Sequence, residues 1–496
     1  MILIRDAQVV DGTGAPPKEA DVLVSGTRIA AVGKFRNYRA ETIIDGRDGY
    51  VLPGFIDINN DSDHYLTLFT NPLQHDFLVQ GVTTVIGGHC GSSLAPLLYG
   101  TLESIRKWTD PDQINVGWHT VREFLTAITR RRLGVNFGTL VGHATIRRAL
   151  IGEELRDLTV NEMKVFERTL DSALREGAFG FSTGLGYAHA RQVPYAEIHA
   201  LAKITAGRGI YTTHLRDEHE GIIKSINETI RLARETGVST LVSHFRPLLG
   251  YEQEFNAALT LLDKENPDTS IRFDSYPSDM SMHTIYTLLP EWCRRGNLEL
   301  ILSHLKNVHM RERLLKEIPL FQGRDLIVVH APHASYLVGK SIGSFSENHG
   351  LDSQNALFTL MRVTKLRAVV LVRNVNIDAA IQSLCHARAF VASNAPSFLP
   401  EAHVVRHERM IDVFPKFLRI VLNAKFLSFE KAVQKITSDA AQFLGLKNRG
   451  EVREGMAADL VLWRSDRVET VIVNGEIAIR DGIPTGARAG TTLLNA

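Results

Sequence analysis

The sequence is poor in cysteine, with only Cys90, Cys293 and Cys385 in a chain of 496 residues. Their odd number and wide spacing exclude a disulfide framework of the kind that stabilises small secreted domains. A chain of this length can bury a sizeable apolar core without covalent cross-links. The scarcity of cysteine therefore predicts a globular protein of a reducing compartment, and we expect a cytoplasmic location.

An excess of charge of either sign is also missing. Lys and Arg number 56 and Asp and Glu number 55, so the formal net charge is +1. Such a balance gives no electrostatic footprint for nucleic acid. No apolar run approaches the roughly 18–20 residues of a membrane span, and Arg5 and Asp6 interrupt the place where a signal peptide needs its apolar core. We expect neither nucleic acid nor a membrane as partner, and the oligomeric state stays open.

Short apolar segments separated by turn signals are present at both ends of the chain. They cover residues 1–4, 8–10, 21–24 and 29–32 near the start, and 459–463, 470–473 and 476–480 near the end. Dipeptides such as Asn474-Gly475 between them are typical of tight turns in β-hairpins. The two sets predict one small β-sandwich built from both termini, formed by residues 1–50 and 445–496.

The middle of the chain, residues 51–444, alternates strand-like apolar runs with helical patterns, which is typical of an α/β fold with a parallel sheet. Thr159 and Glu162 form a capping box that begins one helix, and Gly237 ends another. Eight strands are predicted, the number that a (β/α)₈ TIM barrel needs: residues 54–58, 83–87, 136–142, 178–183, 210–215, 240–244, 271–275 and 389–393.

More than a hundred residues separate the last two predicted strands, far more than one crossover helix requires. This spacing predicts an inserted subdomain at about residues 278–340. Further apolar runs at 326–329 and 368–372 compete for a place among the barrel strands.

Polar side chains that can carry chemistry follow the strand ends, where the active sites of such barrels lie. In chain order they are Asn59, Asp61, Cys90, His143, Ser182, His214, His244, Asp274, Tyr276 and Asn394. The thiolate of Cys90 and the imidazoles of His214 and His244 would make a zinc site with its fourth position open to water or substrate. Taken singly, a buried cysteine is more often a packed thiol, and a buried histidine a hydrogen-bonded core residue.

Eight collinear segments resemble the N-acyl-D-amino-acid deacylases, a family of metal-dependent amidohydrolases. They are PGFID at 53–57, QGVTT at 80–84, CGSSLAP at 90–96, VGHATIR at 141–147, GAFGFSTGLGY at 177–187, THLRDE at 213–218, VSHFR at 242–246 and DSYP at 274–277. The tail at 444–463 is similar to that of many amidohydrolases. The resemblance covers most of the chain apart from about residues 291–372.

The resemblance implies that Cys90, His214 and His244 hold a tight zinc ion. The family's second, weaker metal position uses a His-x-His pair after the first strand and an aspartate after the last. Here Asn59 and Asp61 stand in place of the pair, and Asn394 in place of the aspartate. The fourth strand ends in Ser182, where other relatives have a bridging carboxylated lysine. We therefore expect one zinc ion per chain.

In the family mechanism the aspartate accepts a proton from water and returns it to the leaving amine. Asn394 has no usable basicity near neutral pH. Asp61 is the carboxylate that could replace it, as a base or as a fourth ligand, with His64 and His89 as weaker alternatives. The other interpretation of Asp61 is a solvated loop carboxylate or a helix cap. Asp61 and Asn394 are therefore the candidate catalytic residues.

Arg216 and Arg246 each follow a zinc histidine by two residues, and a guanidinium suits bidentate binding of a substrate carboxylate. Tyr187 and Tyr276 match family tyrosines near the scissile amide and its oxyanion. For all four residues, salt bridges and packing at the barrel mouth are the alternative.

The predicted function is a mononuclear zinc amidohydrolase that hydrolyses an amide resembling an N-acyl amino acid, including the D form. One alternative is a changed reaction in the same pocket: hydrolysis of an unusual C–N or N–N bond, cyclisation or decarboxylation. The other is an inactive zinc-binding homologue that acts as a partner or ligand-binding protein.

Overall fold

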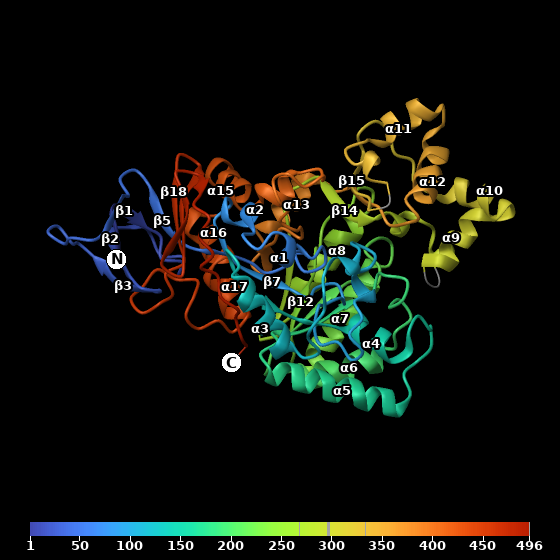
Figure 1. Ribbon diagram of the computed structural model, residues 1–496, viewed down its shortest axis with the longest axis horizontal. Helices are drawn as coiled ribbons and strands as arrows, with labels where there is room; N and C mark the ends of the chain where they lie inside the picture. Colours follow the sequence, from blue (N-terminus) through green and yellow to red (C-terminus); the bar gives the residue numbers. More distant parts are fainter. Residues whose placement is uncertain (267, 295–297, 333, 496) are drawn as a thin grey trace.

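The computed structural model describes residues 1–266, 268–294, 298–332 and 334–495. Figure 1 shows strands from both ends of the chain gathered on one side, in blue and red. A barrel of strands and helices occupies the middle, and a mainly helical segment in yellow and orange lies on the other side.

The strands of the two termini join in one nine-stranded sheet, with the order β21-β20-β19-β18-β5-β1-β2-β3 and β4 beside β1. The N-terminal strands are β1 (Ile2–Val9), β2 (Lys18–Ser25), β3 (Arg28–Gly33), β4 (Thr42–Asp45) and β5 (Tyr50–Pro53). The C-terminal ones are β18 (Leu460–Arg464), β19 (Arg467–Val473), β20 (Glu476–Arg480) and β21 (Ile483–Pro484). Antiparallel pairing of β5 with β18 confirms that both termini build this sheet.

Most of residues 1–4 and 8–10, predicted as separate strands, lies in the single strand β1. Its register shifts between Ile4 and Ala7, where Asp6 has a φ of 55°. A β-bulge of this kind keeps the strand continuous although polar residues interrupt its apolar pattern. The edge strand β3 bonds to the chain that precedes β18: the Ile29 amide donates to the Met456 carbonyl, and the Gly455 amide donates to the Ile29 carbonyl. The sheet thus encloses its own apolar core.

All eight predicted barrel strands are present, and they pair in parallel within two sheets, β6-β7-β8 and β17-β13-β12-β11-β10-β9. The third predicted strand is split into β8 and β9 at Leu140. The strands are β6 (Phe55–Asp57), β7 (Val82–Gly87), β8 (Asn136–Thr139), β9 (Val141–Gly142), β10 (Gly180–Gly184), β11 (Ile210–His214), β12 (Ser239–Val242), β13 (Ile271–Ser275) and β17 (Ala389–Val391).

The barrel closes between its last and first strands. The backbone N–H of Asn394 donates to the backbone carbonyl of Asn59 at 2.9 Å, and the Ser393 hydroxyl donates to the Asp57 carboxylate at 2.5 Å. This closure brings Asn394, from the end of the barrel sequence, beside the loop that follows the first strand.

Helices outside the strands complete the barrel. They include α3 (Val121–Arg131), α4 (His143–Ile151), α5 (Val160–Arg175), α6 (Tyr195–Thr205), α7 (Ile222–Thr236), α8 (Glu252–Asp263) and α13 (Ile377–Leu384). Short helices α1 (Thr67–Thr70) and α2 (His75–Leu78) follow β6, and α14 (Glu408–Ile411), α15 (Val413–Ala424), α16 (Phe429–Ile436) and α17 (Ser438–Phe443) follow β17. The predicted capping box of Thr159 and Glu162 begins α5, and Gly237, with a φ of 72°, ends α7.

A smaller antiparallel sheet lies between β13 and β17, with the order β14-β16-β15. Its strands are β14 (Met280–Thr284), β15 (Leu326–His330) and β16 (Val369–Arg373), and the helices with it are α9 (Leu298–Lys306), α10 (Val308–Glu317), α11 (Ile342–His349) and α12 (Ser353–Val363). The two apolar runs that competed for barrel strands are β15 and β16. The inserted segment therefore extends to Arg373, beyond the predicted end at 340, because β16 pairs with both β14 and β15.

The domain boundaries at residues 50 and 445, and the start of the insertion at about 278, stay predictions. Among the helices described, none is long and apolar enough to cross a membrane.

Candidate metal centre and active site

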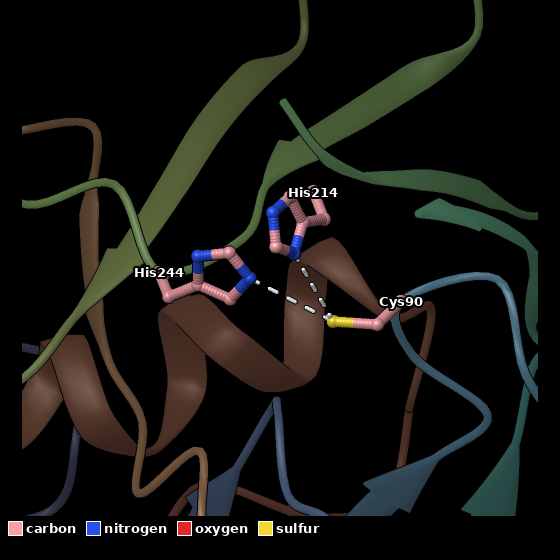
Figure 2. Close-up of side chains that lie close together, drawn as sticks. All are labelled: Cys90, His214 and His244. Atoms are coloured by element: carbon pink, nitrogen blue, oxygen red, sulfur yellow. Dashed lines mark hydrogen bonds between the residues drawn. The ribbon is translucent and has the colours of Figure 1, made fainter. Parts of the chain in front are cut away.

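Three of the predicted ligands converge at one end of the barrel (Figure 2). The Cys90 Sγ lies 4.0 Å from Nδ1 of His214 and 3.6 Å from Nε2 of His244, and one donor atom from each residue lies within 4.8 Å of the others. Cys90 follows β7, His214 ends β11 and His244 follows β12. Within the described part of the chain, no other group of three His, Cys, Asp or Glu residues meets this criterion.

The backbone at this site is unusual. Cys90, His244 and Asn394 have φ values of 52°, 41° and 44°, in the left-handed region that non-glycine residues rarely adopt. Such conformations cost free energy and persist where the surrounding structure holds them, often at functional sites. Here they turn side chains inward immediately after barrel strands.

Glu218 orients the two histidines, and it was not among the predicted site residues. Its carboxylate accepts a hydrogen bond from Nδ1 of His244 at 2.9 Å and lies 3.7 Å from Nε2 of His214. A carboxylate that holds the outer nitrogen of a histidine leaves the other nitrogen free as a metal ligand. The spacing of four residues between His214 and Glu218 in the THLRDE segment was the available signal.

The donor set fits a zinc ion. Zinc–sulfur and zinc–nitrogen bonds of about 2.3 and 2.0–2.1 Å in a tetrahedral arrangement place the donor atoms roughly 3.6 Å apart. The sulfur–nitrogen distances in this structure, 3.6 and 4.0 Å, are close to that value. Burial holds the pKa of His214 well below its ordinary value, so the ring is neutral and presents a lone pair.

Gly186 makes room for the His214 ring. A Cβ atom added at Gly186 would lie 2.4 Å from Nε2 of His214 and 3.0 Å from the Leu215 carbonyl oxygen. Because both contacts are too short, Gly186→Ala is expected to displace the imidazole and weaken zinc binding about 10- to 100-fold, the usual cost of disturbing a ligand's support. The measurement is zinc affinity by competition with a chromophoric chelator.

Gly117→Ala is the matched control, because a Cβ there meets no atom within 4 Å. Equal zinc affinities in the two alanine variants would show that Gly186 does not seat the ligand.

A cavity of about 520 Å³ opens over the three ligands and extends beneath the inserted segment. Residues of the barrel and of the inserted segment both form its wall. Among the predicted site residues it is lined by Asp61, Cys90, Tyr187, His214, Arg216, His244, Arg246, Tyr276 and Asn394. All nine predicted site residues therefore face one cavity.

Asp61 is a buried carboxylate in the cavity wall. Its Oδ1 lies 3.0 Å from Nδ1 of His64, and the other ring nitrogen of His64 lies 3.1 Å from the Ser92 carbonyl oxygen. Since both partners are acceptors, both nitrogens of His64 must carry protons. Burial opposes ionisation, but the hydrogen bond and the charges of His64 and Arg409 hold the pKa of Asp61 below its usual value. The structure thus holds Asp61 as an ionised carboxylate, not as a solvated loop residue.

Asp61 does not join the group of three ligand atoms, so this geometry does not support it as a fourth ligand. His89, the weaker alternative, has a pKa lowered to about 3 by burial, and its Nε2 has no hydrogen-bond partner among the described residues. His89 is not among the residues that line the cavity, whereas Asp61 is, so His89 is not placed to accept a proton there.

The two asparagines serve structural contacts. The Asn59 side chain donates to the Asp274 carboxylate at 3.1 Å. The Asn394 side-chain oxygen accepts a hydrogen bond from Arg409 at 3.0 Å. Arg409 is fully buried, and its Nε and Nη1 have no hydrogen-bond partner among the described residues. The amide of Asn394 therefore lies where a carboxylate would form an ion pair with Arg409.

Both predicted arginines have a carboxylate partner within the protein. Arg216 binds Glu228 through Nε and Nη2, at 3.0 and 2.8 Å, and also donates to the carbonyls of Arg191 and Val193. Four of its five donors are therefore in use, and the salt-bridge alternative is the better interpretation of Arg216. Arg246 pairs with Glu218 through Nη1 at 3.1 Å and Nη2 at 3.4 Å, and its Nη1 also donates to the His244 carbonyl at 2.7 Å. Its Nε is buried without a partner among the described residues.

The two tyrosines are buried in the cavity wall. Tyr187 packs on His214 with ring centroids 4.9 Å apart. The guanidinium carbon of Arg409 lies over the Tyr276 ring, 3.9 Å from the centre of that ring. Other strand-end residues have roles outside the cavity. His143 binds Glu197 at 2.7 Å, Ser182 accepts the Gly91 amide, and Asp274 accepts the His244 backbone amide at 2.8 Å.

A (β/α)₈ barrel that brings a cysteine and two histidines to one cavity at its strand ends is the architecture of a metal-dependent amidohydrolase. The model of the amidohydrolase family matches residues 401–477. The N-acyl-D-aspartate deacylase of Alcaligenes xylosoxydans xylosoxydans is 30% identical over 491 residues, which cover 97% of this chain and 89% of that one.

Solved structures agree. The N-acyl-D-glutamate deacylase from Bordetella bronchiseptica, complexed with zinc and a phosphonate inhibitor, has a TM-score of 0.81 and 26% identity and covers 100% of this chain and 99% of its own. A D-aminoacylase with a binuclear metal centre, activated by one metal and attenuated by the second, has a TM-score of 0.79, 27% identity and the same coverage. The chain belongs to the N-acyl-D-amino-acid deacylase family, and it is a metal-dependent amide hydrolase.

Proposed function

We propose that this protein hydrolyses an N-acyl-D-amino acid to a carboxylate and a free amino acid, with one zinc ion held by Cys90, His214 and His244. The observation that carries the proposal is the convergence of these three donors with the ionised carboxylate of Asp61 around one cavity. A zinc ion in such a site supplies a Lewis acid that polarises a carbonyl and lowers the pKa of water.

Three residues around the zinc ligands transfer the proton, bind the substrate carboxylate and stabilise the oxyanion. Asp61 accepts the proton of the attacking water and returns it to the leaving amine, in place of the aspartate that Asn394 has replaced. Arg246 lines the cavity beside Glu218 and binds the substrate carboxylate. Tyr276 lies across the same cavity and donates a hydrogen bond to the developing oxyanion.

The absence of a His-x-His pair and of the usual aspartate supports a single metal. Asn59 and Asn394 are occupied by Asp274 and Arg409, and neutral amides are weak ligands for zinc compared with imidazole and carboxylate. Metal analysis of the purified protein is expected to find about one zinc ion per chain. Two tightly bound ions per chain would contradict the proposal.

A panel of N-acetyl-D- and N-acetyl-L-amino acids tests the reaction itself. Release of acetate from D substrates but not from their L isomers is the expected result. If zinc is bound but no amide in the panel is cleaved, the changed reaction in the same pocket or the inactive zinc-binding homologue is favoured. If the protein binds no metal, zinc-dependent hydrolysis is excluded.

Arg294 gives a second expectation, about the substrate side chain. It lines the cavity from the inserted segment, and its Nη1 donates a hydrogen bond to the Thr287 carbonyl at 3.2 Å. Among the described ion pairs, Arg191, Arg216 and Arg246 all have carboxylate partners, whereas Arg294 has none. An unpaired guanidinium in a cavity favours a ligand with a second carboxylate. We therefore propose a preference for acidic side chains, as in N-acyl-D-aspartate and N-acyl-D-glutamate.

Arg294→Met is expected to lower kcat/KM for the preferred acidic substrate about 10- to 100-fold, because a charged hydrogen bond contributes roughly 1.5–3 kcal/mol. The value for N-acetyl-D-leucine should change little. Arg311→Met, outside the cavity, is the control. An equal decrease of kcat/KM for both substrates would show that Arg294 does not bind the acidic side chain of the substrate.

A further inference from the structure

A buried lysine lies behind the cavity wall, in the connection between β7 and α3. Lys107 and Trp108 follow the short 3₁₀ helix η1 (Glu103–Ile105), and their exposed fractions are 5% and 6%. Within the described residues, Lys107 has no ion pair with a carboxylate. Burial of a lysine without such a partner is uncommon, because removing an ammonium from water costs free energy.

The Lys107 amine instead lies against two aromatic rings. Its Nζ is 4.0 Å from the centre of the Trp108 ring and 3.8 Å from the centre of the Tyr187 ring. The rings meet edge to face, with centroids 5.9 Å apart and an interplanar angle of 88°. The hydroxyl of Ser92 lies 3.4 Å from the amine. We call Lys107, Trp108 and Tyr187 the aromatic clamp.

Each ring of the aromatic clamp contacts one part of the active site. Trp108 stacks on His64, with centroids 4.1 Å apart and planes only 1° from parallel, and His64 binds Asp61 at 3.0 Å. Tyr187 packs on His214 at 4.9 Å. One amine therefore touches the supports of both the candidate base and a candidate zinc ligand.

Two groups of the protein pack on Trp108. The His64 ring and the Lys107 amine lie at 4.1 and 4.0 Å from the centre of its ring. A ring packed in this way has little freedom to tilt, and its partner His64 is fixed with it. Burial lowers the pKa of Lys107 well below its usual value, yet either form of the amine can point N–H groups at the rings.

We propose that Lys107 is a positioning residue that holds Trp108 and Tyr187 in place, and through them fixes Asp61 and His214 in their working orientations. This role rests on the proposed function, since it is for amide hydrolysis that the two groups must be aligned. A displacement of about 1 Å from a distant change can lower a rate about 10²-fold.

The first test compares Lys107→Met, which keeps the length of the side chain and removes the amine, with Arg106→Met. Arg106 is the adjacent residue and pairs with Glu103 near the surface, so its variant is the matched control. We expect kcat of Lys107→Met to fall about 10- to 100-fold while KM changes less than about twofold. Arg106→Met should retain both values.

The second readout does not require turnover. Cobalt(II) added in one equivalent gives a visible spectrum that reports the geometry of its cysteine and histidine ligands. The absorption bands of Lys107→Met are expected to shift relative to wild type, whereas those of Arg106→Met should match it. If wild type cleaves no substrate in the panel, the proposed function fails and this spectrum still decides the role of Lys107.

Conservative replacement separates positioning from general packing. Trp108→Phe retains a flat ring against His64 and Lys107 and should keep more than about a third of wild-type kcat, whereas Trp108→Leu should lose at least about tenfold. Thermal unfolding establishes that each variant is folded. The proposal is overturned if Lys107→Met matches Arg106→Met in kcat and spectrum, or if the two Trp108 variants lose activity equally.

Discussion

Replacing Cys90 with alanine is expected to remove the bound zinc and to lower kcat/KM by about 10³-fold or more. The sulfur is one of only three donors in the described group, and it lies between the two histidines. A two-ligand site binds zinc far more weakly, and loss of a Lewis acid that contributes several kcal/mol corresponds to this factor. Metal content by mass spectrometry and hydrolysis of the best panel substrate are the measurements.

Cys385→Ala is the control for this variant. Cys385 is half-buried after α13, where its thiol contacts the Ile381 carbonyl, and it lies outside the cavity lining. Its variant should retain zinc and activity. If Cys90→Ala keeps a full equivalent of zinc, the assignment of the metal site is wrong, whatever happens to the rate.

The barrel was predictable because its strands are short apolar runs that alternate with capped, amphipathic helices. This local signal survives in each segment independently, so all eight predicted strands appear in the structure. The end of the inserted segment was not predictable. Residues 369–373 read as one more buried strand, and only their antiparallel pairing with β14 and β15 assigns them elsewhere.

The site was less accessible from the sequence, because its geometry depends on contacts across the barrel. Motif resemblance placed Cys90, His214 and His244, and the structure brings them together. The same reasoning treated Arg216 and Arg246 alike, but the partner that occupies Arg216 is Glu228, twelve residues further along the chain on α7. The contact of Glu218 with both histidines and the left-handed backbone of Cys90 and His244 became visible only in three dimensions.

The contacts of the aromatic clamp could not be predicted from the sequence. No spacing rule connects Lys107 with Tyr187, which is 80 positions away, or Trp108 with His64. Their contacts arise because the loops after three different barrel strands, β6, β7 and β10, meet at one end of the barrel. A lysine beside a tryptophan in a sequence is ordinarily a surface pair, so burial of both side chains is information that only the fold supplies.

Asp61→Asn is expected to lower kcat about 10²- to 10⁴-fold, the usual contribution of a positioned proton acceptor. The amide keeps the size of the carboxylate but cannot accept a proton near neutral pH. Because Asp61 lies outside the three-donor group, the zinc content should stay at one per chain, in contrast to Cys90→Ala. Asp217→Asn is the matched control, since Asp217 also lines the cavity but pairs with Arg191.

Asn394→Asp gives a second test of Asp61 as the proton acceptor. A carboxylate at position 394 would lie beside the Nη2 of Arg409, now 3.0 Å from the amide oxygen, at the place where the family has its proton acceptor. The double variant that combines Asp61→Asn with Asn394→Asp is therefore expected to have a kcat at least about tenfold higher than that of Asp61→Asn alone, because the pocket regains one base. Unchanged turnover in Asp61→Asn would show that Asp61 is not the base. If Asn394→Asp alone creates a deacylase activity absent from wild type, the natural protein has left that chemistry, and the changed reaction is the better proposal.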